Sequence, residues 1–147
     1  MEYQRNKKAS FDYHLLGTYE CGIELTGIET KSIRTGRARL EGAHVIARGG
    51  EAYVVGMTID PYQPGNTPEQ YDPLRTRKLL IHSKEYHEIE TAESKKGLTV
   101  VPIALYNKGT KIKLSVAIAQ GKKAFDKRES IKKRDTDREI RRELKAR

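Results

Sequence analysis

The sequence predicts a small, mainly β protein: a closed antiparallel barrel of about six strands, with two or three short helices and a basic C-terminal tail. Several short segments alternate apolar and polar residues, which is the pattern of strands that bury one face. Turn signals recur about every ten residues, which favours an antiparallel barrel over a parallel sheet. Apolar residues become sparse after Gly121, so we expect the core to lie before that residue.

The composition indicates a folded body with an acidic partner. The 147 residues suit one domain. The net charge of +9 favours nucleic acid or an anionic membrane surface as the partner. No apolar run approaches the ~20 residues of a membrane span, and the N-terminus lacks the apolar core of a signal peptide. The single cysteine, Cys21, is expected to be buried, and these features together predict a soluble, cytoplasmic protein.

The first strand of the body is expected over residues 13–25. Residues 1–12 before it are polar and basic, and they predict an arm that becomes ordered only against a partner. Gly17 and Gly22 inside the strand indicate a bulge or the close approach of another backbone. Glu20 falls on the outward face, either as an ordinary solvated carboxylate or as an acceptor for the amino and imino groups of an exposed base.

A short helix is expected from about Ile28 to Thr35. Lys31 and Arg34 are three residues apart and share a helix face, and Arg37 and Arg39 follow close by. These cations predict a phosphate-binding patch, although a solubilising rim is equally compatible with the pattern.

Five strands, one helix and a long loop complete the expected body. Residues 60–73, rich in proline, are expected to form a long surface loop between the earlier and later elements. Strands at 43–48 and 52–59 are expected to form a hairpin around the turn 48–51, and a further strand is expected at 79–81. A helix capped by Ser83 should run to about Lys95 and end at Gly97. Strands 98–106 and 111–119 are expected to form a second hairpin, with Pro102 at an edge or bulge.

The segment Gly-Lys-Lys-Ala-Phe-Asp-Lys-Arg at 121–128 joins this body to the tail. Residues 122–147 contain 12 Lys and Arg against 6 Asp and Glu, and their apolar residues are too sparse to fold alone. Glu129 with Lys133 and Asp137 with Arg141 have the i, i+4 spacing of helical ion pairs. The chain is therefore divided into a body, 1–121, and a basic tail, 122–147, that is disordered alone and helical against a polyanion. A plain solvated charge run is the alternative.

No recognisable catalytic motif is present. The sequence contains no Cys-x-x-Cys, no glycine-rich phosphate loop and no His-Glu-x-x-His, and its four histidines are scattered. We therefore expect a binding protein and not an enzyme, with no metal and no cofactor.

Several segments resemble the SsrA-binding protein family, also called small protein B, the bacterial partner of transfer-messenger RNA in the rescue of stalled ribosomes. These segments are 19–25, 31–34, 72–80, 97–106, 121–123 and 126–128. The resemblance implies a barrel related to the oligonucleotide-binding fold, which holds the tRNA-like part of that RNA. It also implies a tail that enters the decoding region and messenger channel of the ribosome. A structural ribosomal RNA-binding protein and a catalyst on RNA are the competing classes.

The basic patch and the resemblance together define the expected interfaces. The expected RNA-binding residues are Asn6, Lys7, Glu20, Lys31, Arg34, Arg37, Arg75, Arg77, Leu80, His82, Lys113, Lys122 and Lys123. The expected ribosome-binding tail residues are Phe125, Asp126, Lys127, Arg128, Lys132, Lys133, Arg134, Arg138, Ile140, Arg141 and Leu144. The expected partners are transfer-messenger RNA and the ribosome, including its ribosomal RNA. No membrane contact is expected, and the protein is expected to be a monomer.

Overall fold

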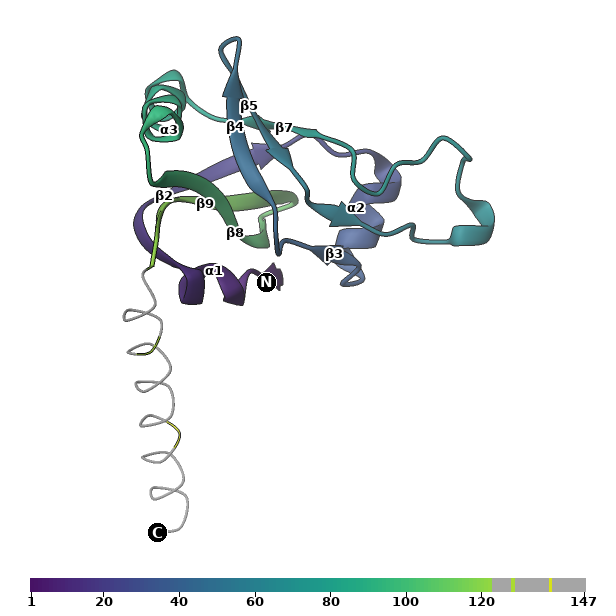
Figure 1. Ribbon diagram of the computed structural model, residues 1–147. Coiled ribbons are helices and arrows are strands. Elements are labelled where there is room, and N and C mark those ends of the chain that lie inside the picture. The colour runs from purple at the N-terminus through teal and green to yellow at the C-terminus, as the bar shows by residue number, and fades with distance from the viewer. Residues whose placement is uncertain (123–127, 129–137, 139–147) are drawn as a thin grey trace.

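The computed structural model describes residues 1–122, 128 and 138 (Figure 1). Within these residues the protein is mainly β, with nine strands and three α-helices. In Figure 1 the helices lie at separate places around the sheet and do not form a bundle. No helix among these residues is long and apolar enough to cross a bilayer.

Seven strands form one sheet in which every pair is antiparallel. Their order is β1 (Glu2–Arg5), β8 (Leu98–Lys108), β9 (Lys111–Gly121), β2 (Tyr13–Ile23), β7 (Arg77–Leu80), β5 (Glu51–Val55) and β4 (His44–Arg48). The strands β3 (Ala38–Arg39) and β6 (Thr58–Ile59) pair separately. Because β4 at one end of the order also contacts β8 near the other end, the sheet is strongly curved.

The prediction of about six strands was too low for three reasons, the first being that it missed the two-residue strand β3, which pairs with β6. The strand expected over 52–59 is interrupted at Gly56, whose φ of 82° turns the chain, so β5 and β6 are separate and join different sheets. In addition, residues 2–5 form β1 against β8.

The predicted N-terminal arm is part of the body, and that prediction was wrong. After β1, the helix α1 (Lys7–Asp12) packs Ala9 against Val101 of β8. Asn6 begins this helix: its side-chain oxygen accepts from the Ala9 amide at 3.2 Å, and its side-chain nitrogen donates to the Pro102 carbonyl at 3.0 Å. These contacts order the segment without a partner.

The glycines of β2 act as predicted. The register of β2 against β9 shifts between Leu15 and Gly17, which is the expected bulge. Gly22 lies so close to the neighbouring strand that a Cβ added there would approach the Leu80 Cβ to 3.1 Å. Cys21, the residue before Gly22, is completely buried, as expected.

The other two helices are α2 (Gly27–Arg34) and α3 (Ser83–Ser94). The N-cap of α2 is Thr26, which forms a reciprocal capping box with Glu29. Ser83 was predicted to cap α3, but the cap residue is His82, without a side-chain bond, and Ser83 is the first helical residue. Gly97 follows α3 with a φ of 85° and leads into β8.

The two predicted hairpins are present. Gly49 and Gly50, both with positive φ, form the β4–β5 turn, and the irregular β8–β9 register next to Pro102 is the predicted bulge. The inward residues of β9, among them Leu114 and Val116, are completely buried in the core. The residues between them, such as Lys113, project to the opposite, outward face of the sheet.

Candidate nucleic-acid interface

One row of side chains crosses four strands on the outward face of the sheet. In the register of the sheet, Tyr106 lies opposite Lys113, Lys113 opposite Gly22, and Gly22 opposite Leu80. Paired residues project from the same side of a sheet, so these four positions share one face. The row therefore joins β8, β9, β2 and β7.

Gly22 leaves a gap in this row, and two depressions open there. One, of about 470 Å³, lies on the Glu20 side, and the other, of about 400 Å³, extends towards Arg34 and Thr110. Both are lined by Gly22, Leu80 and Lys113. Leu80 is 52% exposed, although it belongs to an apolar run, so it is available to pack against a ligand.

Glu20 is held on this face by two donors. Its carboxylate accepts hydrogen bonds from the Tyr106 hydroxyl and, at 2.9 Å, from the Lys108 ammonium. These two bonds hold the pKa of Glu20 below its ordinary value. Burial and the bond to Glu20 raise the pKa of Tyr106 to about 12, so the hydroxyl stays protonated. We call Glu20, Tyr106 and Lys108 the Glu20 triad; it presents an ionised acceptor whose position is already fixed.

One cation of the predicted phosphate patch, Arg34, lies beside this face, whereas the Arg37 guanidinium donates to the Pro61 carbonyl at 3.4 Å. Lys31, Arg34 and Arg37 are exposed on or just after α2. The Arg34 guanidinium donates to the Thr110 carbonyl at 3.3 Å, which brings it to the β8–β9 turn and into the second depression with Lys113. Cations placed this way can bind phosphates on either side of a base held in the gap.

Two other predicted cations lie elsewhere. Lys122 donates from its side chain to the Ser10 carbonyl of α1 at 3.1 Å, and Lys7 is exposed on the same helix. Gly121 and Lys113 are eight residues apart on β9, which corresponds to about 27 Å of strand. The structure therefore does not bring the α1 end of the body together with the depressions.

The structure contradicts the prediction that Arg77 contacts RNA. Arg77 is completely buried, and its guanidinium donates to Glu29, to the Met57 carbonyl at 2.8 Å and to the Pro73 carbonyl at 3.1 Å. Asn6 is also wrong as an RNA ligand, because it is 6% exposed and both ends of its amide bond the body. Both side chains support the fold.

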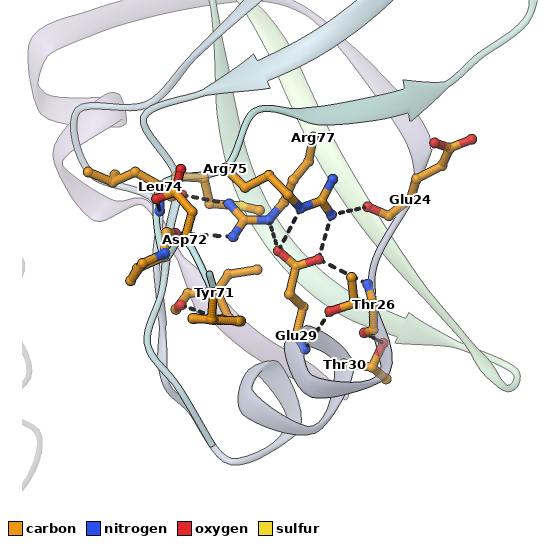
Figure 2. A network of polar contacts seen from close by, with 12 residues as sticks. Glu24, Thr26, Glu29, Thr30, Tyr71, Asp72, Leu74, Arg75 and Arg77 are labelled. Carbon is orange, nitrogen blue, oxygen red and sulfur yellow. Dashed lines mark hydrogen bonds and ion pairs between the residues drawn. The ribbon is translucent and has the colours of Figure 1, made fainter. Parts of the chain in front are cut away.

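Glu29 is the centre of the buried polar network in Figure 2, where it lies between Arg75 and Arg77. Burial raises its pKa, but the hydrogen bonds from Arg75, the Thr26 amide and Arg77 outweigh that effect and leave the pKa below its ordinary value. Arg75 is 40% exposed and also donates to the Glu24 carbonyl. The network ties α2 to the segment before β7, and so fixes the patch relative to Leu80.

His82 stays at the edge of the interface. It lines the 470 Å³ depression with Glu20 and Leu80 and is the cap residue of α3. Sequence reasoning missed Tyr106 and Lys108, although they lie opposite Lys113 and Lys111 of β9, which alternation places on the outward side. Among the described residues, no group of three or more His, Cys, Asp or Glu side chains could hold a metal ion.

The predicted tail contacts fall mostly outside the part of the chain that the structure describes. Arg128 and Arg138 are described, and both are helical and exposed. The predicted residues outside the described part are Lys123, Phe125, Asp126, Lys127, Lys132, Lys133, Arg134, Ile140, Arg141 and Leu144.

Known proteins resemble the chain along almost its whole length. The family model described as SmpB protein matches residues 3–146. The SsrA-binding proteins of Gloeothece citriformis and Ligilactobacillus salivarius are 46% and 47% identical to it, over 95% and 96% of this chain and 90% of each relative. A solved structure described as "tmRNA-SmpB: a journey to the center of the bacterial ribosome" is similar with a TM-score of 0.70 and 37% identity, covering 87% of this chain and 93% of that one.

Proposed function

This chain belongs to the SmpB family of SsrA-binding proteins, and from that premise we propose that it binds the tRNA-like part of transfer-messenger RNA and delivers it to stalled ribosomes. The observation that carries the proposal is the outward Glu20 carboxylate, held ionised beside the exposed Leu80 and Lys113. A carboxylate accepts hydrogen bonds from an unpaired base, an exposed leucine packs on the face of the base, and a lysine pairs with its phosphate. The protein acts by binding and does no chemistry on the RNA.

In this proposal the curved sheet closes into a small barrel related to the oligonucleotide-binding fold. Contact between β4 and β8, together with the antiparallel order of the strands between them, supports closure. Barrels of this kind bind nucleic acid on an outward strand face and its neighbouring loops. The Glu20 triad, the two depressions and Arg34 occupy such a face.

Residues 1–121 form the RNA-binding body in this proposal, and residues 122–147 are the basic tail that meets the ribosome in its decoding region and messenger channel. The core supports this division, because its buried residues all precede Gly121 in the part of the chain that the structure describes. The 12 Lys and Arg of the tail neutralise phosphates of ribosomal RNA. The protein acts as a monomer in the cytoplasm, where its partners are.

The test is to identify the RNA that co-purifies with the tagged protein from bacterial cells, and to measure peptide tagging in a reconstituted stalled-ribosome assay. We expect one structured RNA, the transfer-messenger RNA, and less than one copy of protein per ribosome. Stable binding of ribosomal RNA at one copy per ribosome would instead identify a structural ribosomal protein. Cleavage of labelled RNA in the presence of Mg²⁺ would identify a nuclease.

A further inference from the structure

A second carboxylate on the sheet is held in the same way as Glu20. Glu51 of β5 accepts a 2.6 Å hydrogen bond from the Tyr53 hydroxyl at one oxygen and a 2.8 Å bond from the Lys78 ammonium at the other. The Glu20 triad has the same three groups, with a lysine distance of 2.9 Å. We call Glu51, Tyr53 and Lys78 the Glu51 triad.

Both triads lie on the same outward face. Tyr53 is opposite Lys78 in the β5–β7 pair, and Leu80, two residues after Lys78, is opposite Gly22 in the β7–β2 pair. Alternate residues of a strand project to one side, so this register places the Glu51 triad on the face that carries Glu20. Leu80 lies between the triads: it lines the 470 Å³ depression with Glu20 and a second one, of about 490 Å³, with Glu51 and Lys78.

The two carboxylates are too far apart to contact one base. The register separates Glu20 from Glu51 by two strand spacings across the sheet and two residues along it. With a strand spacing of about 4.8 Å and a rise of about 3.4 Å per residue, their Cα atoms are about 12 Å apart. That exceeds the width of a nucleobase, so a strand of RNA lying over Leu80 would present different nucleotides to the two triads.

The exposure and charge of the Glu51 triad suit a ligand. The Glu51 side chain is 44% exposed, against 39% for Glu20, and exposed ion pairs of this kind contribute little to stability. The bonds from Lys78 and Tyr53 lower the pKa of Glu51, so it is ionised at neutral pH. Lys78 offsets that charge, which lets a polyanion approach. An ionised carboxylate accepts hydrogen bonds only, and in RNA those donors lie on base edges and 2′-hydroxyls, not on phosphates.

We propose that the Glu51 triad is a second base-reading site of this face and takes an unpaired nucleotide of the same RNA that binds at the Glu20 triad. Glu51 accepts hydrogen bonds from the amino or imino groups of the base, the Tyr53 ring stacks on it, and Lys78 turns to the neighbouring phosphate. This inference rests on the proposed RNA-binding function and assigns that function a second point of contact.

The sign of the effect of Glu51→Gln on RNA affinity tests the proposal. Near a polyanion, removal of a negative charge strengthens binding unless the carboxylate itself makes a contact. We expect the Kd of the full chain for the isolated tRNA-like RNA, at fixed salt, to rise about 5-fold or more, which corresponds to the loss of one base contact. Tyr53→Phe, which removes one hydroxyl and leaves the charge unchanged, should weaken binding in the same direction. Lys78→Met should lower the salt slope by about one ion.

The controls separate this inference from the proposed function. Glu41→Gln removes the same charge at an exposed turn before β4 and should leave Kd unchanged or slightly lower. In chemical footprints, Glu51→Gln and Glu20→Gln should each lose protection at a different nucleotide. If Glu20→Gln weakens binding while Glu51→Gln leaves it unchanged or strengthens it, the Glu51 triad is a plain surface ion pair. If the unaltered protein does not bind the tRNA-like RNA, the proposed function itself is wrong.

Discussion

Replacement of the buried Glu29 by glutamine should destabilise the body strongly. Glu29 is 1% exposed and its partner Arg77 is 0% exposed, so the variant leaves a guanidinium charge in the core without its counter-charge. Breaking a buried ion pair from one side costs about 3–5 kcal/mol. Glutamine keeps the size and one acceptor of the side chain, so the loss reports mainly the charge. For a domain of this size we expect the melting temperature to fall by roughly 10–20 °C.

The same network has a defined pH dependence. The folded-state pKa of Glu29 lies below its ordinary value of 4.5, so the pair contributes stability above that pH and loses it as the pH falls through the lowered pKa. The difference in unfolding free energy between the unaltered protein and Glu29→Gln should therefore be full at pH 7 and shrink below about pH 4.5.

Urea unfolding followed by circular dichroism measures these differences. Glu41→Gln, at an exposed site, should change stability by less than about 0.5 kcal/mol. The double variant Glu29→Met, Arg77→Met should be less destabilised than the sum of its single changes, because it leaves no unpaired charge. A loss below about 1 kcal/mol for Glu29→Gln would refute the reasoning, since it would mean that water or a rearrangement solvates Arg77 in the folded state.

Three further predictions concern the partners. Glu20→Gln should weaken binding to the tRNA-like RNA by about 1–3 kcal/mol although it raises the net charge, and an unchanged or lower Kd at fixed salt would make Glu20 an ordinary surface carboxylate. Gly22→Ala places a methyl group 3.1 Å from the Leu80 Cβ and fills the gap, so filter binding should show a several-fold weaker complex while the melting temperature shifts by only a few degrees. Truncation after Arg128 should leave the melting temperature nearly unchanged, because the buried residues of the described part of the chain precede Gly121. It should weaken RNA binding modestly and abolish peptide tagging, because the removed cations neutralise ribosomal phosphates. Full tagging by the truncated protein would show that the removed residues have no role on the ribosome.

The sequence could predict the long strands. The strands β2, β8 and β9 each span eleven residues, and they were recognised with small errors at their ends. Burial alternates most regularly at the start of β9, where Ile112, Leu114 and Val116 are buried and the residues between them are less so. By contrast, β1 and α1 are short, polar and held by backbone pairing to β8 and by Asn6, whose partner Pro102 is 96 residues away. No local pattern in residues 1–12 indicates such distant contacts.

The interface was predictable where one strand face decides the exposure of a side chain. Glu20 and Lys113 follow from the alternation of β2 and β9. Arg77 failed because a basic residue beside an apolar run was read as a phosphate ligand, whereas it shares the inward side of β7 with Leu79. Its buried counter-ion, Glu29, lies 48 positions earlier in the chain, and the capping box with Thr26 accounts for only part of its role.

The tie between Lys122 and α1 determines where the chain leaves the body. Lys122 donates from its backbone to the Asp12 carbonyl at 2.9 Å and from its side chain to the Ser10 carbonyl, so the first residue of the tail has a set position. The outward face around Lys113 lies about 27 Å away along β9. The number of residues in β9 thus sets the spacing between the proposed RNA-binding face at one end of the body and the start of the tail at the other. Because β2 pairs with β9 over this whole length, two residues would have to be added to each of β2, β8 and β9 to lengthen that spacing by about 7 Å.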